Sequence, residues 1–221
     1  MPAKVRTLID VHEQNAPGRF THYDWKVVRP QLDAAITITE TFLSQKAAID
    51  ADPHLTSKGK DAARVKAAKD ALEALGKWHT PRLAGLDADL ATQRAALVPT
   101  GDKPDPRRVE LMASRLVQFT PDETRVFYTS STTTDEERLV MEAASVLVGR
   151  VPMKTGNGQE MRPLLDPETV NETQMARAAE KNPQAVARLN ELADIRAMHV
   201  TIAGHAVAEV REALGGVSVD A

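Results

Sequence analysis

Residues 182–216 read NPQAVARLNELADIRAMHVTIAGHAVAEVREALGG, and this stretch carries the clearest pattern in the chain. Apolar or small side chains recur in alternating steps of three and four, the spacing of one helix face. This first row comprises Val186, Leu189, Ala193, Val200, Ala203, Val207, Val210 and Leu214. A second row beside it comprises Leu192, Ile195, His199, Ile202 and Ala206. So broad an apolar face must be covered, so we predict a long buried helix that packs within its own chain or against another copy.

Arg196 alone interrupts the first row. A guanidinium in an apolar environment costs on the order of several kcal/mol unless it is paired. It could set the register or the choice of partner, with Glu191 or Asp194 as its counter-ion, or the helix could rotate so that Arg196 reaches solvent. The candidate interface residues of this helix are therefore Val186, Leu189, Arg196, Val200 and Val207.

The composition indicates a soluble, helix-rich protein. Of 221 residues, 42% are hydrophobic and 27% charged, which is typical of a folded globular protein. Only 4% are aromatic, so aliphatic side chains must fill the core, and that suits packed helices better than a β-sandwich. We predict a mainly α fold: a helical bundle with long helices, an extended N-terminal arm and a small β-hairpin or loop insertion.

Charge and cysteine content exclude several classes of function. The net charge of −3 gives no long-range attraction to nucleic acid or to anionic membranes. The absence of cysteine excludes disulfides, thiolate chemistry and zinc sites that need a Cys ligand. No apolar run is long enough for a signal peptide or a membrane span, so we expect a cytoplasmic protein without a membrane partner.

Breaks in the pattern divide the chain into four parts. Residues 1–29 are expected to form the extended arm, because Val5, Ile9 and Val11 look strand-like and Ala16-Pro17-Gly18 interrupts regular structure. From Pro30 a helical pattern begins, and residues 30–98 are expected to contain an Ala-rich hairpin or one long bent helix.

Three prolines between 99 and 106 predict a linker. Residues 107–221 are expected to be helical, with a hairpin or loop at 151–163 around Asn157-Gly158 and the long C-terminal helix. Two capping boxes, Thr120 with Glu123 and Thr134 with Glu137, mark helix starts in this part.

Phe20, Tyr23 and Trp25 form an aromatic patch at the end of the expected arm. Such side chains bury large areas when they dock. Docking on the protein's own helices is the favoured interpretation, but contact with another molecule remains open, so all three are candidate interface residues.

No catalytic or metal-binding motif appears in the sequence. None of the six histidines has a partner at the spacing of a zinc or di-iron site, and neither a P-loop nor a Gly-x-Ser-x-Gly motif occurs. We therefore expect no enzyme activity, cofactor or metal, although an unfamiliar active site stays an alternative.

Residues 58–82 form the one local basic segment. Its positive charges could follow a nucleic-acid backbone, with Lys58, Lys60, Arg64, Lys66 and Lys69 as candidate contacts. They are spread around the expected helix, however, and no aromatic lies among them before Trp78. A solvated helix surface is therefore favoured over nucleic-acid binding.

The segment Asp52-Pro53-His54-Leu55-Thr56-Ser57-Lys58-Gly59-Lys60 and the Ala/Leu-rich stretch after it, within residues 50–98, resemble small helical virion-associated proteins of tailed bacteriophages. This resemblance is largely one of composition. It implies a structural head, connector or tail accessory protein that packs against copies of itself and other virion proteins. A nucleic-acid-binding or packaging accessory is the alternative function.

Overall fold

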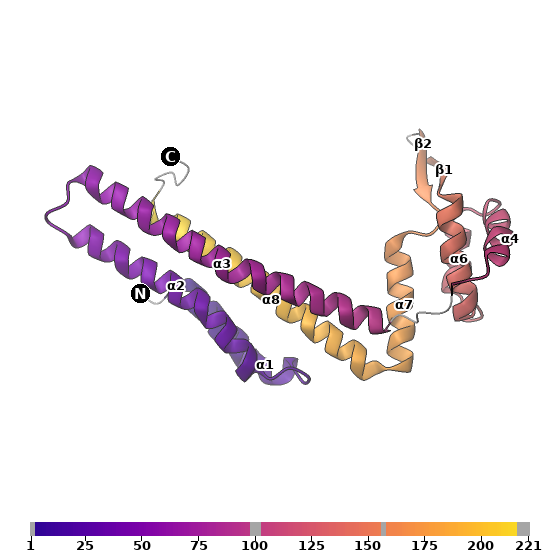
Figure 1. Cartoon of the computed structure of the whole chain (residues 1–221), viewed down its shortest axis with the longest axis horizontal. Helices are drawn as coiled ribbons and strands as arrows, with labels where there is room; N and C mark the ends of the chain where they lie inside the picture. The colour runs from indigo at the N-terminus through magenta and orange to yellow at the C-terminus, as the bar shows by residue number, and fades with distance from the viewer. Residues whose placement is uncertain (1–2, 98–102, 156–157, 216–221) are drawn as a thin grey trace. The chain divides into compact units, whose positions relative to one another are not determined.

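The computed structural model describes residues 3–97, 103–155 and 158–215, without the side chains of 16–19 and 152–160 (Figure 1). The chain divides into two compact units: unit 1 comprises Met1–Arg94 and Ala187–Ala221, and unit 2 comprises Ala95–Val186. The elements are α1 (Lys4–Arg19), α2 (Trp25–Ala51), α3 (Ser57–Leu97), α4 (Pro106–Leu116), α5 (Pro121–Thr129), α6 (Asp135–Val148), β1 (Arg150–Thr155), β2 (Gly158–Pro163), α7 (Pro167–Lys181) and α8 (Pro183–Ala213). The predicted mainly α bundle with long helices and a small hairpin is confirmed.

Unit 1 is built from α1, α2, α3 and α8 around one apolar core. Helices α2 and α3 are antiparallel neighbours joined by residues 52–56, and α8 lies along α3 (Figure 1). The largest fully buried apolar side chains of this core come from all four helices. They include Ile9, Leu32, Phe42, Leu75, Ile202 and Val210. The C-terminal helix therefore packs with the N-terminal half of the chain, whereas the sequence analysis grouped it with residues 107–181.

Helix α8 has the predicted bounds, but the centre of its buried face is the second row of the sequence pattern. All five members of that row, from Leu192 to Ala206, are at most 3% exposed. The first row lies toward the edge, where Val200 is 41% exposed and Ala193 is also exposed. The broad apolar face was predicted correctly, and the structure places the second row at its centre.

The predicted extended arm is wrong, because residues 4–19 form α1. Val5 and Ile9 are both fully buried, and Leu8 packs against the same core, so the apolar spacing is helical. The prediction counted Val11, which is 47% exposed, and overlooked Leu8. The break expected at Pro17 does not occur before Arg19.

Two glutamates of α8 hold the ends of α1 in place. Glu209 accepts hydrogen bonds from the backbone N–H groups of Lys4 and Val5, at 2.8 and 3.2 Å, where α1 begins. Glu191 accepts from the backbone N–H groups of residues 21–23 and from the Thr21 hydroxyl at 2.6 Å. Eighteen residues are five helical turns, so both carboxylates lie on the same face of α8, roughly 27 Å apart. Both glutamates are 8% exposed.

Further boundaries differ from prediction by a few residues. Helix α2 begins at Trp25 rather than Pro30, because Asp24 accepts a hydrogen bond from the N–H of Lys26 as the N-cap. Helix α3 continues through Pro81, so residues 57–97 form one helix. Half of the predicted 99–106 linker, residues 99–102, lies outside the described residues, and α4 already begins at Pro106.

Unit 2 contains α4 to α7 and the hairpin. Both predicted capping boxes are present, at Thr120 before α5 and at Thr134 before α6. Gly149 ends α6 with φ = 72°, a backbone region that favours glycine. The antiparallel pairing of β1 and β2 runs from Arg150 opposite Pro163 to Thr155 opposite Gly158. The core of unit 2 combines Val109, Leu116, Tyr128, Val140, Met141, Ala144, Leu164 and Leu165.

Candidate protein-binding site

An open groove of about 650 Å³ lies along α4 and α5 of unit 2. Its apolar side chains come from one side of each helix and from the turn between them. The full lining is Met112, Arg115, Phe119, Asp122, Glu123, Val126, Phe127 and Ser130. We refer to these eight residues as the α4/α5 groove.

Helix α5 exposes apolar side chains because three consecutive residues of the helix are large and apolar. Tyr128 is fully buried and Thr124 lies on the same inward face, four residues away. Val126 and Phe127 precede Tyr128 by about 200° and 100° of helix rotation, and they are 70% and 38% exposed. A nine-residue helix packed on one side cannot bury all three.

Exposed apolar side chains are concentrated in unit 2. Among the described residues, eight large exposed hydrophobic side chains belong to unit 2: Leu111, Val117, Phe119, Val126, Phe127, Val146, Leu147 and Met161. Only Val11, Val27 and Val200 belong to unit 1. Single exposed apolar residues are ordinary, but three of these eight, Phe119, Val126 and Phe127, line the groove together, which is typical of an interaction surface.

Charges of both signs flank the groove. Arg115 at the end of α4 and Asp122 in the first turn of α5 are exposed, and neither has an ion-pair partner in the described part of the chain. Glu123 instead completes the capping box, and the hydrogen bonds from Thr120 lower the pKa of its carboxyl. The groove thus offers an apolar centre with one free cation and one free carboxylate.

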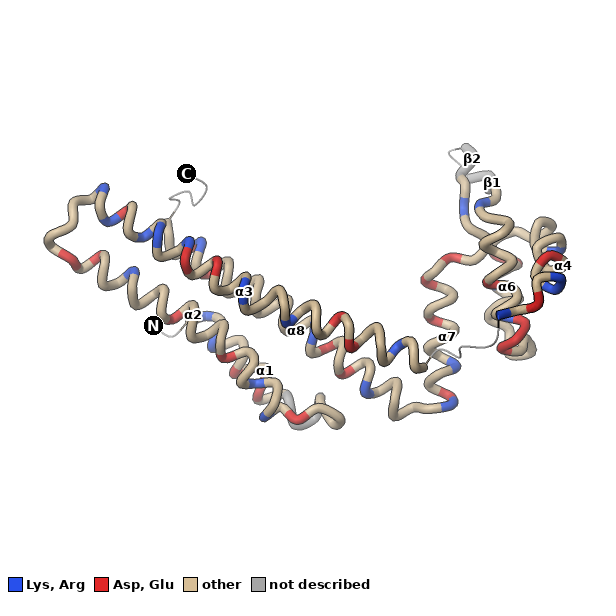
Figure 2. The backbone as a smooth tube through the Cα atoms, viewed as in Figure 1, with Lys and Arg blue, Asp and Glu red and all other residues tan. Residues whose placement is uncertain are grey.

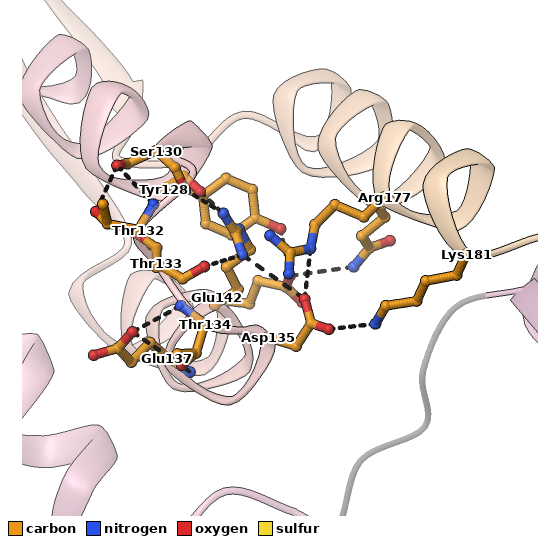
Figure 3. Close-up of polar contacts among 12 residues, drawn as sticks. Tyr128, Ser130, Thr132, Thr133, Thr134, Asp135, Glu137, Glu142, Arg177 and Lys181 are labelled. Carbon is orange, nitrogen blue, oxygen red and sulfur yellow. Dashed lines mark hydrogen bonds and ion pairs between the residues drawn. The ribbon is translucent and has the colours of Figure 1, made fainter.

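A buried arginine organises the loop between α5 and α6 (Figure 3). The Arg138 side chain is 5% exposed and donates to the backbone carbonyls of Tyr128, at 2.8 Å, Ser130, at 2.5 Å, and Thr133. Thr133 in turn donates to the carbonyl of Phe127 at 2.7 Å. These contacts fix the C-terminal end of α5, and with it the orientation of the groove.

The same cluster joins α5, α6 and α7 through compensated charges (Figure 3). The Tyr128 hydroxyl donates to Glu142 at 2.5 Å, and burial together with this carboxylate raises the pKa of Tyr128. Asp135 lies 2.6 Å from both Lys181 Nζ and Arg177 Nε, and the Lys181 hydrogen bond lowers its pKa. Because these groups are matched with one another around a pocket of about 150 Å³, we interpret the cluster as a structural element of unit 2.

The aromatic patch docks on the protein's own helices. Phe20 is 9% exposed and stacks on Trp25, with ring centroids 6.0 Å apart. The Tyr23 hydroxyl accepts a hydrogen bond from Gln93 of α3 at 3.0 Å, and Arg188 of α8 lies over its ring. All three aromatics belong to the unit 1 core or pack against it, so the patch is occupied within the chain.

The remaining candidate interface residues, on α8, are not brought together into one exposed surface. Leu189 is 7% exposed, and Val186 and Val207 are half-buried. Arg196 pairs with Asp87 of α3 at the edge of the bundle, not with the expected Glu191 or Asp194. The rotation of α8 brings the Arg196 guanidinium to solvent, which was one of the two interpretations that the sequence left open for this residue.

Charges along α3 are mixed in sign (Figure 2). Lys60 donates to the Asp50 carbonyl at 2.7 Å, and Arg64 pairs with Asp50 and Asp61. Of the predicted nucleic-acid contacts, Lys58, Lys66 and Lys69 are exposed. Such alternation is typical of a solvated helix surface.

His199 of α8 is completely buried against Trp78, with ring centroids 5.6 Å apart. Neither ring nitrogen has a hydrogen-bond partner within the described ranges. Burial, and to a smaller extent the neighbouring Arg82 and His79, lowers the pKa of His199 to about 4. It is therefore a neutral core residue at pH 7. Groups of three or more His, Cys, Asp or Glu side chains that could hold a metal ion are absent from the described residues.

Sequence reasoning did not find the α4/α5 groove. The one available signal was the run Val126-Phe127-Tyr128 in a short helix, since successive side chains there point about 100° apart.

Comparison with known proteins gives no relative: no protein-family model, curated protein or solved structure matches the chain. The described helices include none with the length and apolarity to cross a membrane.

Proposed function

We propose that the protein is a non-enzymatic assembly protein that binds other protein subunits through the α4/α5 groove. The observation that carries this proposal is the groove of unit 2, which is lined by the exposed apolar side chains of Phe119, Val126 and Phe127. Apolar surface at the centre with charges at the rim is the usual anatomy of a protein interface.

The rest of the molecule supports a scaffold role. In unit 1 the long helices bury their apolar faces against one another, so this unit needs no partner to form a core. The polar cluster around Arg138 holds α5 in one orientation, which lowers the entropy cost of docking on it. Assignment to a tailed-phage virion, as a head, connector or tail accessory, rests on the sequence resemblance of residues 50–98 alone.

Nucleic-acid packaging through residues 58–82 stays a weaker proposal. The basic segment is interrupted by Asp61, Asp70 and Glu73, and Lys77 pairs with Glu73 on the same helix. No feature of the described residues favours it over protein binding.

Co-sedimentation tests the proposed function. In lysates of the cells that naturally express it, the protein should sediment in a complex with the subunits it binds, at a mass of at least twice the chain's 24.1 kDa. Val126→Glu should move the protein to the low-mass fractions. Binding would bury the new carboxylate in the groove without a counter-ion or a hydrogen-bond donor, which costs free energy. Val200→Glu, an exposed apolar position on unit 1, is the matched control and should stay in the assembly. Low-mass sedimentation of the wild-type chain would overturn the proposal.

A further inference from the structure

We infer that the occupant of the α4/α5 groove is a second copy of this chain, which docks groove to groove about a two-fold axis. This inference rests on the proposed function and narrows it, because it names the partner. Three features of the groove favour a second copy: its apolar centre, the charges at its rim and the absence of ion-pair partners for Arg115 and Asp122 in the described part of the chain.

The apolar centre can pack against itself. In a two-fold interface the same surface is used by both subunits, so each contacting group must be compatible with its own kind or with its symmetry mate. Phe119, Val126 and Phe127 satisfy this condition, because aromatic and branched apolar side chains pack well against one another.

The rim charges are self-complementary. Arg115 is on α4 and Asp122 is on α5, and both line the same groove. A two-fold axis through the apolar centre exchanges the two sides, so Arg115 of one copy can face Asp122 of the other, twice per dimer. A partner with a rim of one charge sign would be attracted at one side and repelled at the other.

Both rim charges are available for such pairing. Two other charged groups of α4 and α5 have partners of their own: Arg108 pairs with Glu136, and Glu123 is held by Thr120. Arg115 and Asp122 have none in the described part of the chain, and both are exposed.

Sedimentation velocity of the purified full-length protein tests the inference. We expect twice the 24.1 kDa monomer mass at micromolar concentration, with dissociation on dilution. Val126→Glu should weaken the dimer at least tenfold, whereas Val200→Glu should leave it unchanged. Helical circular dichroism of both variants should equal that of the wild type, which separates lost binding from lost folding.

Charge reversal distinguishes the groove from any other dimer interface. Arg115→Asp and Asp122→Arg should each weaken self-association at least tenfold, because each then places like charges opposite one another. An equimolar mixture of the two variants should associate again, to within about threefold of the wild type, since every facing pair becomes opposite in sign.

Two outcomes would overturn the inference. A wild-type monomer at all concentrations would show that the groove does not bind a second copy, and if co-sedimentation persisted, the proposed function would survive with a different partner. A dimer that is indifferent to all three groove substitutions would place the self-interface elsewhere.

Discussion

Units 1 and 2 differ in how completely they bury their large apolar side chains. In unit 1, four helices converge on one core, and two buried carboxylates of α8 accept hydrogen bonds from backbone N–H groups at the start of α1 and in the turn between α1 and α2. In unit 2, the short helices α4, α5 and α6 bury one side and leave large apolar side chains in solvent on the other. The contrast shows that unit 1 covers most of its large apolar side chains itself, whereas unit 2 leaves several of them uncovered.

The largest effect is expected from Arg138→Ala in unit 2. Removing the guanidinium leaves three buried or partly buried carbonyls without their donor, at a cost of about 4 kcal/mol in the free energy of unfolding. Hydrogen exchange should show lost protection in α5 and α6 with little change in unit 1. The exposed Arg107→Ala is the control and should change stability by less than about 0.5 kcal/mol. Equal loss of protection in both units would contradict their independence.

Glu191→Ala should destabilise unit 1 by about 3 kcal/mol, because it removes a buried charged acceptor of several hydrogen bonds. Burial raises the pKa of Glu191, but the hydrogen bonds from Thr21 and His22 outweigh it, and the pKa falls to about 2. The stability that this carboxylate contributes is therefore fully present above pH 4.5 and is lost as the pH falls toward 2.

Urea unfolding of the wild type and the Glu191→Ala variant between pH 7 and pH 2 checks this dependence. The two curves of stability against pH should converge at the acid end. Asp89→Ala on exposed α3 surface should run parallel to the wild type. A Glu191→Ala curve that stays parallel to the wild type would show that the carboxylate is not the acid-sensitive group.

His199→Leu should stabilise unit 1 by about 1 kcal/mol at pH 7, because it removes two buried nitrogens without partners. The folded pKa of about 4 lies below the usual 6.5, so the unfolded state binds the proton more tightly. The stability that the neutral His199 side chain contributes is therefore fully present above pH 6.5 and is lost as the pH falls toward 4.

Thermal unfolding at pH 7 and pH 5 tests the pH dependence of the stability that His199 contributes. The gain from His199→Leu should be larger at pH 5 than at pH 7. An identical gain at both pH values would mean that His199 is not the group that takes up the proton.

The smallest effect is expected from Arg196→Ala. Its ion pair with Asp87 is exposed, and such pairs contribute less than about 1 kcal/mol. A double-mutant cycle with Asp87→Ala measures the coupling directly. A coupling of several kcal/mol would instead support the interpretation that Arg196 sets the register of α8.

Periodic patterns allowed much of the fold to be predicted, and tertiary contacts decided the rest. The capping boxes at Thr120 and Thr134 and the bounds of α8 depend on local spacing, which is visible in the sequence. The helical spacing of α1 is local too, but it was missed because Leu8 was overlooked. The carboxylates that hold the two ends of this helix, Glu191 and Glu209, lie about 170 to 205 residues away along the chain. No local signal reports such a contact.

The candidate site could be predicted even less well. Apolar residues on α8 were candidates for the interface, with packing inside the chain left open, and much of their face is used inside unit 1. The exposure of Val126 and Phe127 depends on how α5 packs against α6. A further helix on the other side of α5 could have buried these two side chains as well as Tyr128. A sequence shows which side chains are apolar, and only the assembled core shows which of them stay uncovered.

Site-specific photo-crosslinking in the cells that naturally express the protein tests the central claim most directly. A benzophenone side chain would replace Val126 in the α4/α5 groove or Val200 on unit 1, one position at a time. We predict cross-linked protein from position 126, with the second copy as the partner, and none from position 200. Cross-links from position 200 with none from position 126 would contradict the account.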